Sequence, residues 1–139
     1  MTCPDHGREE VLGRLEIRAT PAEVAPARHW LCKLLAGDHA AIVDDVVLMA
    51  CEAITNSICH SDSGGTEPGT VTLLVLNVGG ALRVEVIDAG SRCNVPKVAD
   101  DGLEALTGRG LHMIELLSGG RWGTHAHDES RTVWFETCH

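Results

Sequence analysis

Glu52 and Asn56 stand one helical turn apart in the segment CEAITNS, which a run of Ser, Asp and Gly soon ends. Residues four apart share a face of a helix, so this carboxylate and this amide would lie side by side. A carboxylate placed there can orient or deprotonate an attacking nucleophile. An Asn carbonyl can bind magnesium, which completes its shell with water and phosphate oxygens. A solvated helix face without a chemical role is the plainer alternative.

Two glycine-containing motifs follow further along the chain. Asp88 and Gly90 end the segment VEVIDAG, and Gly108, Arg109 and Gly110 precede LHMIELLS. An Asp at a strand end can accept a hydrogen bond from an exocyclic amine such as N6 of adenine. Glycines before a helix let backbone N–H groups approach an anion, which the helix N-terminus also favours. Each motif alone also fits a turn or a tight loop.

Together the three motifs supply a hydrogen-bond acceptor for an adenine base, a ligand for magnesium and a backbone site for phosphate. The sequence contains no GxxxxGK[ST], so a P-loop is not predicted. GRG follows a segment without periodic pattern rather than a strand, so a Rossmann turn is not predicted either. The motifs therefore indicate a nucleotide site of another kind.

Hydrophobic periodicity and turn residues predict the elements that must position these side chains. The expected order is strand, helix, helix, hairpin, loop, helix, hairpin. Thr20 and Pro21 suit the start of a helix, and Gly37 suits its end. The expected ranges are 14–19 for the first strand, 21–36 and 39–60 for two helices, 70–88 for a hairpin around two glycines, 108–118 for a third helix and 121–138 for the last two strands.

The order of these elements lacks a repeated strand–helix alternation, so a doubly wound parallel sheet is not expected. Segregated strands and helices indicate an α+β protein, a two-layer α/β sandwich with helices on one face of a mixed, mostly antiparallel sheet. Residues 1–12 are predicted to form a flexible N-terminus. Residues 13–139 are predicted to form one domain, which suits a chain of 139 residues.

Charge and composition exclude several classes of function. The formal net charge of −9 argues against a nucleic-acid surface, although a basic patch on a protein partner remains compatible with it. The N-terminus lacks the features of a signal peptide, and no apolar run reaches membrane-spanning length, so a cytoplasmic protein is expected. Six cysteines lack the paired spacing of zinc modules, and no HExxH-type spacing indicates a zinc hydrolase.

The order E-x-x-x-N, D-x-G and G-x-G resembles the N, G1 and G2 boxes of the GHKL ATPase superfamily, which has the Bergerat ATP-binding fold. The resemblance covers residues from about 15 to 135. The single-domain layout, the segment GRGLHMIELLS and the ending RWG…TVWFE are most similar to the bacterial anti-sigma-factor serine/threonine kinases of the RsbW and SpoIIAB type, in their actinobacterial branch. The loop 91–107 is short, which implies a small lid over the nucleotide.

The resemblance implies roles for the residues of the boxes. Glu52 would be the general base, and Asn56 would bind Mg2+ and so help to hold ATP. Asp88 would bind the adenine amine, with Gly90 allowing the nucleotide to come close. Thr132 on the last strand would help to hold the base through water.

The phosphate contacts are implied in the same way. Gly108, Arg109, Gly110 and Leu111 would lie at the phosphates of ATP, with Gly110 and Leu111 opening the third helix. No phosphoacceptor helix pair precedes the domain, so a complete histidine kinase is not expected.

The implied activity is that of an ATP-dependent serine/threonine protein kinase. It would phosphorylate an anti-anti-sigma partner of the STAS type and sequester a sigma factor, and so regulate transcription without binding nucleic acid or membrane. The resemblance also suggests a homodimer through the first strand and helix, although the composition requires none. A nucleotide-responsive sequestering protein without turnover is the alternative, and a domain that binds no nucleotide is a further one.

Overall fold

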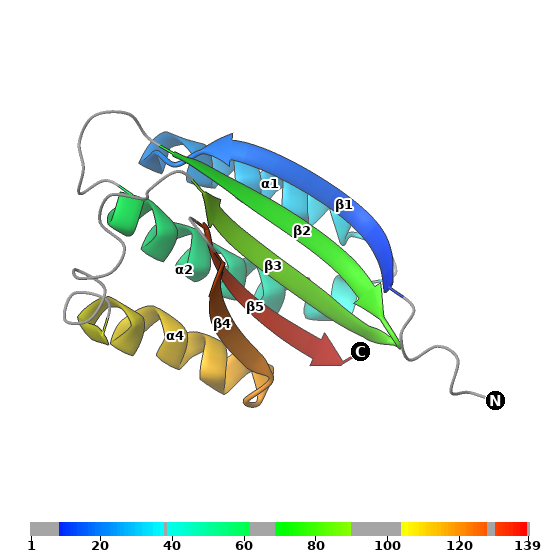
Figure 1. Ribbon diagram of the computed structural model, residues 1–139. Coiled ribbons are helices and arrows are strands. Elements are labelled where there is room, and N and C mark those ends of the chain that lie inside the picture. The colour runs from blue at the N-terminus through cyan, green and yellow to red at the C-terminus, as the bar shows by residue number, and fades with distance from the viewer. Residues whose placement is uncertain (1–8, 38, 62–68, 90–103, 128–129, 139) are drawn as a thin grey trace.

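Two layers make up the molecule, a sheet and a set of helices that cover one of its faces (Figure 1). The computed structural model describes residues 9–37, 39–61, 69–89, 104–127 and 130–138. The strands are β1 (Glu9–Arg18), β2 (Thr70–Val78), β3 (Ala81–Ala89), β4 (Trp122–His127) and β5 (Ser130–Cys138). The helices are α1 (Val24–Leu34), α2 (Val43–Ser61) and α4 (Glu104–Ser118), with 3-10 turns η2 (Pro21–Glu23) and η3 (Ala40–Ile42) before α1 and α2.

The sheet has five strands in the order β1-β2-β3-β5-β4. Each neighbouring pair is antiparallel, so the α+β sandwich is confirmed, while the expectation of a mixed sheet is wrong for the described strands. Hairpins connect β2 with β3 and β4 with β5, and the helices α1 and α2 lie between β1 and β2. The connection from β3 through α4 leads to β4, which runs in the same direction as β3 and is separated from it by β5. The last strand is inserted between β3 and β4 rather than added at an edge.

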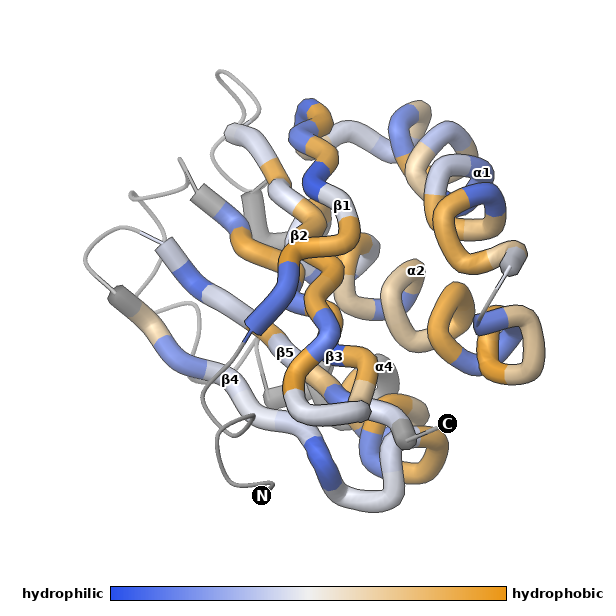
Figure 2. The backbone as a smooth tube through the Cα atoms, turned by 90° about the vertical axis from the view of Figure 1, so that its right-hand side faces the viewer, coloured by the Kyte–Doolittle hydropathy of each residue, from blue (hydrophilic) through white to orange (hydrophobic). Residues whose placement is uncertain are grey.

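The core lies between the sheet and the helices. Side chains alternate between the two faces of a strand, so one face of each strand carries the apolar positions. Figure 2 shows this alternation of hydrophobic and hydrophilic residues, with α1 and α2 on one side of the strands. The buried strand residues on the helix side include Val71, Leu73, Val75, Leu82, Val84, Val86, Val133 and Phe135, and the buried helix residues include Leu31, Met49, Ala53, Ile54 and Ile114.

Two glycine pairs lie at the ends of elements, and the first of them is the pair predicted within the hairpin. Gly79 and Gly80 connect β2 and β3 with φ values of 57° and 91°, which suits the tight turn of a hairpin. Gly119 and Gly120 follow α4 with φ values of 69° and 86°, and the N–H of Gly120 donates to the carbonyl of Glu115 at 3.1 Å. That bond satisfies a carbonyl of the last turn of α4.

The first strand begins earlier than predicted. β1 starts at Glu9, so residues 9–12 belong to the sheet rather than to a flexible N-terminus. Glu9, Glu10 and Val11 pair with the end of β2, at Val78, Asn77 and Leu76. Backbone pairing with a neighbouring strand explains the difference, because a polar edge segment can pair without a hydrophobic alternation of its own. Among the described helices, none is long and apolar enough to cross a membrane.

The face of the sheet away from the helices carries a polar and aromatic cluster. Arg83 donates to Glu85 and to Glu136 at 2.9 Å, and its guanidinium lies 4.2 Å from the centre of the Trp134 ring. Gly123 is the strand partner of Trp134. These contacts connect β3, β5 and β4 across the outer face of the sheet.

Gly123→Ala is expected to destabilise the protein by about 1–3 kcal/mol, because an added methyl group overpacks this cluster. A Cβ at this position would lie 2.8 Å from Nε1 of Trp134, and moving the ring would disturb its contact with Arg83. Thermal or denaturant unfolding measures the effect. Gly37→Ala is the matched control, because a Cβ there meets no atom within 4 Å. Equal stability of the two variants would contradict this account of the cluster.

Candidate active site

Asn56 of α2 is the first predicted site residue to consider, and it lines a pocket between the helices and the sheet. Met49, Ala53 and Ile54 bury one side of α2 in the core, and Asn56 lies half-buried beside that side. Its amide Nδ2 is buried and makes no hydrogen bond in the described part of the chain. A buried amide without a protein partner costs free energy unless another group satisfies it. Asn56 is therefore prepared for a ligand.

Asp88 reaches the same region from the sheet. It follows Leu82, Val84 and Val86 on the helix-facing side of β3, and it is the last position of that side for which the structure describes the side chain. The strand alternation thus places a carboxylate where the three preceding positions place apolar groups. Asp88 is only 4% exposed. A carboxylate buried at a strand end can accept hydrogen bonds from a ligand that enters between the layers.

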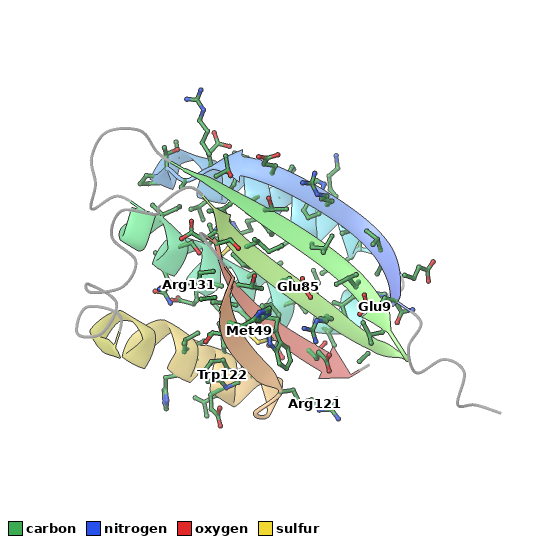
Figure 3. All side chains as sticks on the ribbon, in the orientation of Figure 1. Glu9, Met49, Glu85, Arg121, Trp122 and Arg131 are labelled. Atoms are coloured by element: carbon green, nitrogen blue, oxygen red, sulfur yellow. The ribbon has the colours of Figure 1, made fainter. Side chains whose placement is uncertain are left out.

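A pocket of about 360 Å³ opens between α2, α4 and the ends of β3, β4 and β5. Figure 3 shows Arg131 in the space between α2 and α4, and Trp122 of β4 next to α4. The volume falls within the range of about 300–1,000 Å³ that small-molecule sites occupy. The pocket combines polar and apolar walls, and it is lined by Asn56, Ser57, Asp88, Leu111, Trp122, Thr124, His125, Ala126, Arg131 and Val133.

Three residues predicted for the site meet in this pocket. Asn56, Asp88 and Leu111 come from α2, β3 and α4, far apart in the sequence, and all three line it. Glu52 lies one turn before Asn56 on α2 and is half-buried, but it is not among the lining residues. Gly90 lies outside the described residues.

Thr132 lies on the face of the sheet away from the helices, whereas Asp88 lies on the helix side. On β5 it pairs with Ile87 of β3, whereas its neighbour Arg131 pairs with Asp88. Because successive residues of a strand point to opposite faces, Thr132 and Asp88 point away from each other. Thr132 is buried, 8% exposed, and does not line the pocket. The structure therefore does not bring the Thr132 hydroxyl to the predicted base site.

The start of the third helix also differs from the prediction. α4 begins at Glu104, so Gly108, Arg109 and Gly110 lie within the helix instead of opening it with Leu111. In an α-helix only the first four N–H groups lack an intrahelical acceptor, and here they belong to residues 104–107. The segment EALT explains the earlier start, because Glu, Ala and Leu are good helix formers and glycine within a helix costs only about 1 kcal/mol. The glycines do not form a cradle at the helix N-terminus in this conformation.

Sequence reasoning missed Ser57, Trp122 and Arg131, which also line the pocket. Trp122 donates from Nε1 to a carboxylate oxygen of Glu115, which connects β4 to α4 beside the pocket. Ser57 directly follows Asn56, and helix geometry alone could have indicated it. Arg131 could have been found only with the register between β3 and β5.

Cys51, next to Glu52 on α2, is not an activated thiol. Burial raises the pKa of the Cys51 thiol; Arg28 lowers it and the charge of Glu52 raises it further, with a net increase. A thiol with a raised pKa stays protonated at neutral pH and is a poor nucleophile.

No group of three or more His, Cys, Asp or Glu side chains that could hold a metal occurs in the described ranges. The polar side chains that line the pocket include the amide of Asn56, the carboxylate of Asp88 and the guanidinium of Arg131.

The fold is a two-layer α/β sandwich in which a helix amide and a strand-end carboxylate face one cavity. The family comparison agrees, since the histidine kinase-like ATPase domain matches residues 17–132. The match covers most of the chain, and the protein belongs to this family, the superfamily of GHKL ATPases. Family membership indicates ATP binding. No curated protein sequence matches the chain closely enough to count as a relative.

Proposed function

We propose that the pocket between α2 and the ends of β3 and β5 binds ATP together with Mg2+. The observation that carries the proposal is the meeting of Asn56, Asp88 and Leu111 in one cavity, in a chain of the histidine kinase-like ATPase family. Asp88 would accept from the 6-amino group of adenine, and Leu111 and Val133 would provide apolar contact for the ring. Burial of Asp88 would strengthen this hydrogen bond, because the carboxylate competes with little water there.

The donor set fits a magnesium ion that arrives with the nucleotide. Magnesium takes one or two protein oxygens and completes its octahedral shell with phosphate oxygens and water. Asn56 supplies one carbonyl oxygen at the pocket wall, and its unpartnered Nδ2 means that the amide can turn without breaking a described protein hydrogen bond. The ion would neutralise phosphate charge, which a protein of net charge −9 otherwise repels.

We further propose that the protein is an anti-sigma-factor-like serine/threonine kinase. Glu52, one turn from Asn56, would accept the proton of the attacking hydroxyl while the pocket holds ATP in place. Phosphoryl transfer requires mainly such positioning and charge neutralisation. The substrate would be a Ser or Thr of an anti-anti-sigma partner of the STAS type, and a sigma factor would be the sequestered protein.

A regulatory protein without turnover is the second candidate. Two observations favour it: Glu52 does not line the pocket, and Gly108–Gly110 lie within α4 rather than at its start. In that case ATP would shift the protein between conformations of different partner affinity, without transfer of phosphate.

Two measurements separate these candidates. Calorimetric titration of the purified chain with ATP is expected to show binding that weakens when EDTA removes Mg2+. Single-turnover incubation with γ-labelled ATP and a purified STAS-type protein is expected to move the label to that protein. Binding without transfer to any STAS-type protein tested would favour the regulatory candidate, and absence of ATP binding would overturn both.

A further inference from the structure

Arg131 and Asp88 are direct partners across two antiparallel strands. The register of β3 and β5 pairs them, next to the pairs Ile87 with Thr132 and Val86 with Val133. Directly opposite residues have Cβ atoms about 4.5–5.5 Å apart and share a face of the sheet. Because Val86 and Val133 are buried against the helices, the alternation places Asp88 and Arg131 on the helix side as well. Both residues line the pocket.

The guanidinium of Arg131 has no protein acceptor in the part of the chain that the structure describes. No hydrogen bond or ion pair connects it to another described residue, although it is half-buried and opposite a carboxylate. Arg83, on the outer face of the same sheet, shows the contrast: it is bound by Glu85 and Glu136 and lies over the Trp134 ring. An arginine offers five N–H donors. Those of Arg131 are therefore available to a ligand in the pocket.

The chemistry of adenine matches this pair of side chains. Its Watson–Crick edge presents a donor, the 6-amino group, beside an acceptor, the ring nitrogen N1. A carboxylate only accepts and a guanidinium only donates, so the two groups side by side complement that edge. Guanine presents the reverse order on the same edge, an acceptor at O6 and a donor at N1. When the C6 substituent of the base lies at Asp88 and N1 lies at Arg131, both side chains can bind adenine but neither can bind guanine. The pair of Asp88 and Arg131 therefore favours adenine over guanine.

We propose that Arg131 is a specificity-determining residue that donates to N1 of adenine while Asp88 accepts from the 6-amino group. This inference rests on the proposed binding of ATP and names a contact within it. It also explains how the base is held although Thr132 points to the other face of the sheet. Arg131, which precedes Thr132 on β5, then supplies the contact to N1 directly through its charged guanidinium.

The experiment compares two nucleotides on two proteins. ATP and 1-deaza-ATP, in which a C–H group replaces N1, are titrated calorimetrically into the native chain and into Arg131→Met. The native chain is expected to bind ATP about tenfold more tightly than 1-deaza-ATP, as for a hydrogen bond to a charged group. Arg131→Met is expected to bind both with the same affinity, and Arg131→Lys is expected to restore part of the preference.

Two controls separate this contact from a general loss of charge or of stability. 7-Deaza-ATP keeps N1 and is expected to bind like ATP to the native chain. Arg14→Met removes an exposed positive charge from β1 and is expected to leave the preference for N1 unchanged. Thermal denaturation of each variant shows that the folded protein was titrated.

The possible failures can be told apart. If the native chain binds ATP and 1-deaza-ATP equally, Arg131 does not contact N1 and the inference is wrong, while ATP binding stands. If Arg131→Met weakens both nucleotides but keeps the preference for N1, the guanidinium acts on the phosphates instead, and the inference is again wrong. If the native chain binds neither nucleotide, the proposed function itself fails.

Discussion

Asp88→Asn is expected to weaken ATP binding by about 10- to 100-fold, the range for a lost hydrogen bond to a charged group. The substitution keeps the size of the side chain and removes its charge. Asp88 is 4% exposed and lines the pocket, so water replaces the carboxylate poorly. Calorimetry with ATP measures the change.

The role of Asp88 in reading the amine is tested separately with inosine triphosphate, which has a carbonyl in place of the 6-amino group. The native chain is expected to prefer ATP over this analogue, and Asp88→Asn is expected to lose that preference. Asp44→Asn, an exposed carboxylate on α2, is the control for the loss of one negative charge. A variant that unfolds at the same temperature as the native chain and still prefers ATP would show that Asp88 does not bind the amine.

Glu52→Gln is expected to lower phosphoryl transfer by about 10²–10⁴-fold, the usual contribution of a general base. The affinity for ATP is expected to stay within about twofold, because Glu52 does not line the pocket and an effect confined to the chemical step leaves ground-state binding unchanged. Single-turnover transfer from γ-labelled ATP to a STAS-type protein measures the rate, and calorimetry measures the affinity.

Asp45→Asn is the matched control, because it removes an exposed carboxylate two turns earlier on the same helix. It is expected to leave both the transfer rate and the affinity unchanged. Full transfer activity in Glu52→Gln would remove Glu52 from the chemistry. A rate loss accompanied by an equal loss of ATP affinity would instead assign Glu52 to nucleotide binding.

Local pattern was sufficient for most of the elements. The alternation in TVTLLVLNV and ALRVEVID, with two glycines between them, predicted β2 and β3 because strand period and turn chemistry agree there. The start of β1 was missed because its first residues are polar and their position depends on pairing with β2. The start of α4 was missed because good helix formers outweighed the glycine signal at Gly108.

The candidate site was predictable only as far as each residue carries its own local signal. Asn56 and Asp88 were identified because a helix face and a strand end are visible in the sequence. Thr132 and Arg131 are adjacent, and their faces follow from the register between β3 and β5, which long-range contacts decide. A shift of one residue in that register would exchange the two side chains, so no local pattern could choose between them.

The position of β5 makes the pocket depend on the strand that comes last in the described sheet. β4 is made before β5, yet its only partner in the described sheet is β5. Until the last nine residues of the sheet, Ser130–Cys138, are in place, β4 has no strand to pair with and Arg131 is absent from the cavity wall. β5 must also pair with β3, from which α4 and β4 separate it in the chain, and such long-range pairing is slow compared with forming a hairpin. A chain without β5 would therefore hold the Asn56 helix and the Asp88 hairpin without a complete pocket, and the proposed nucleotide binding would be lost with that strand.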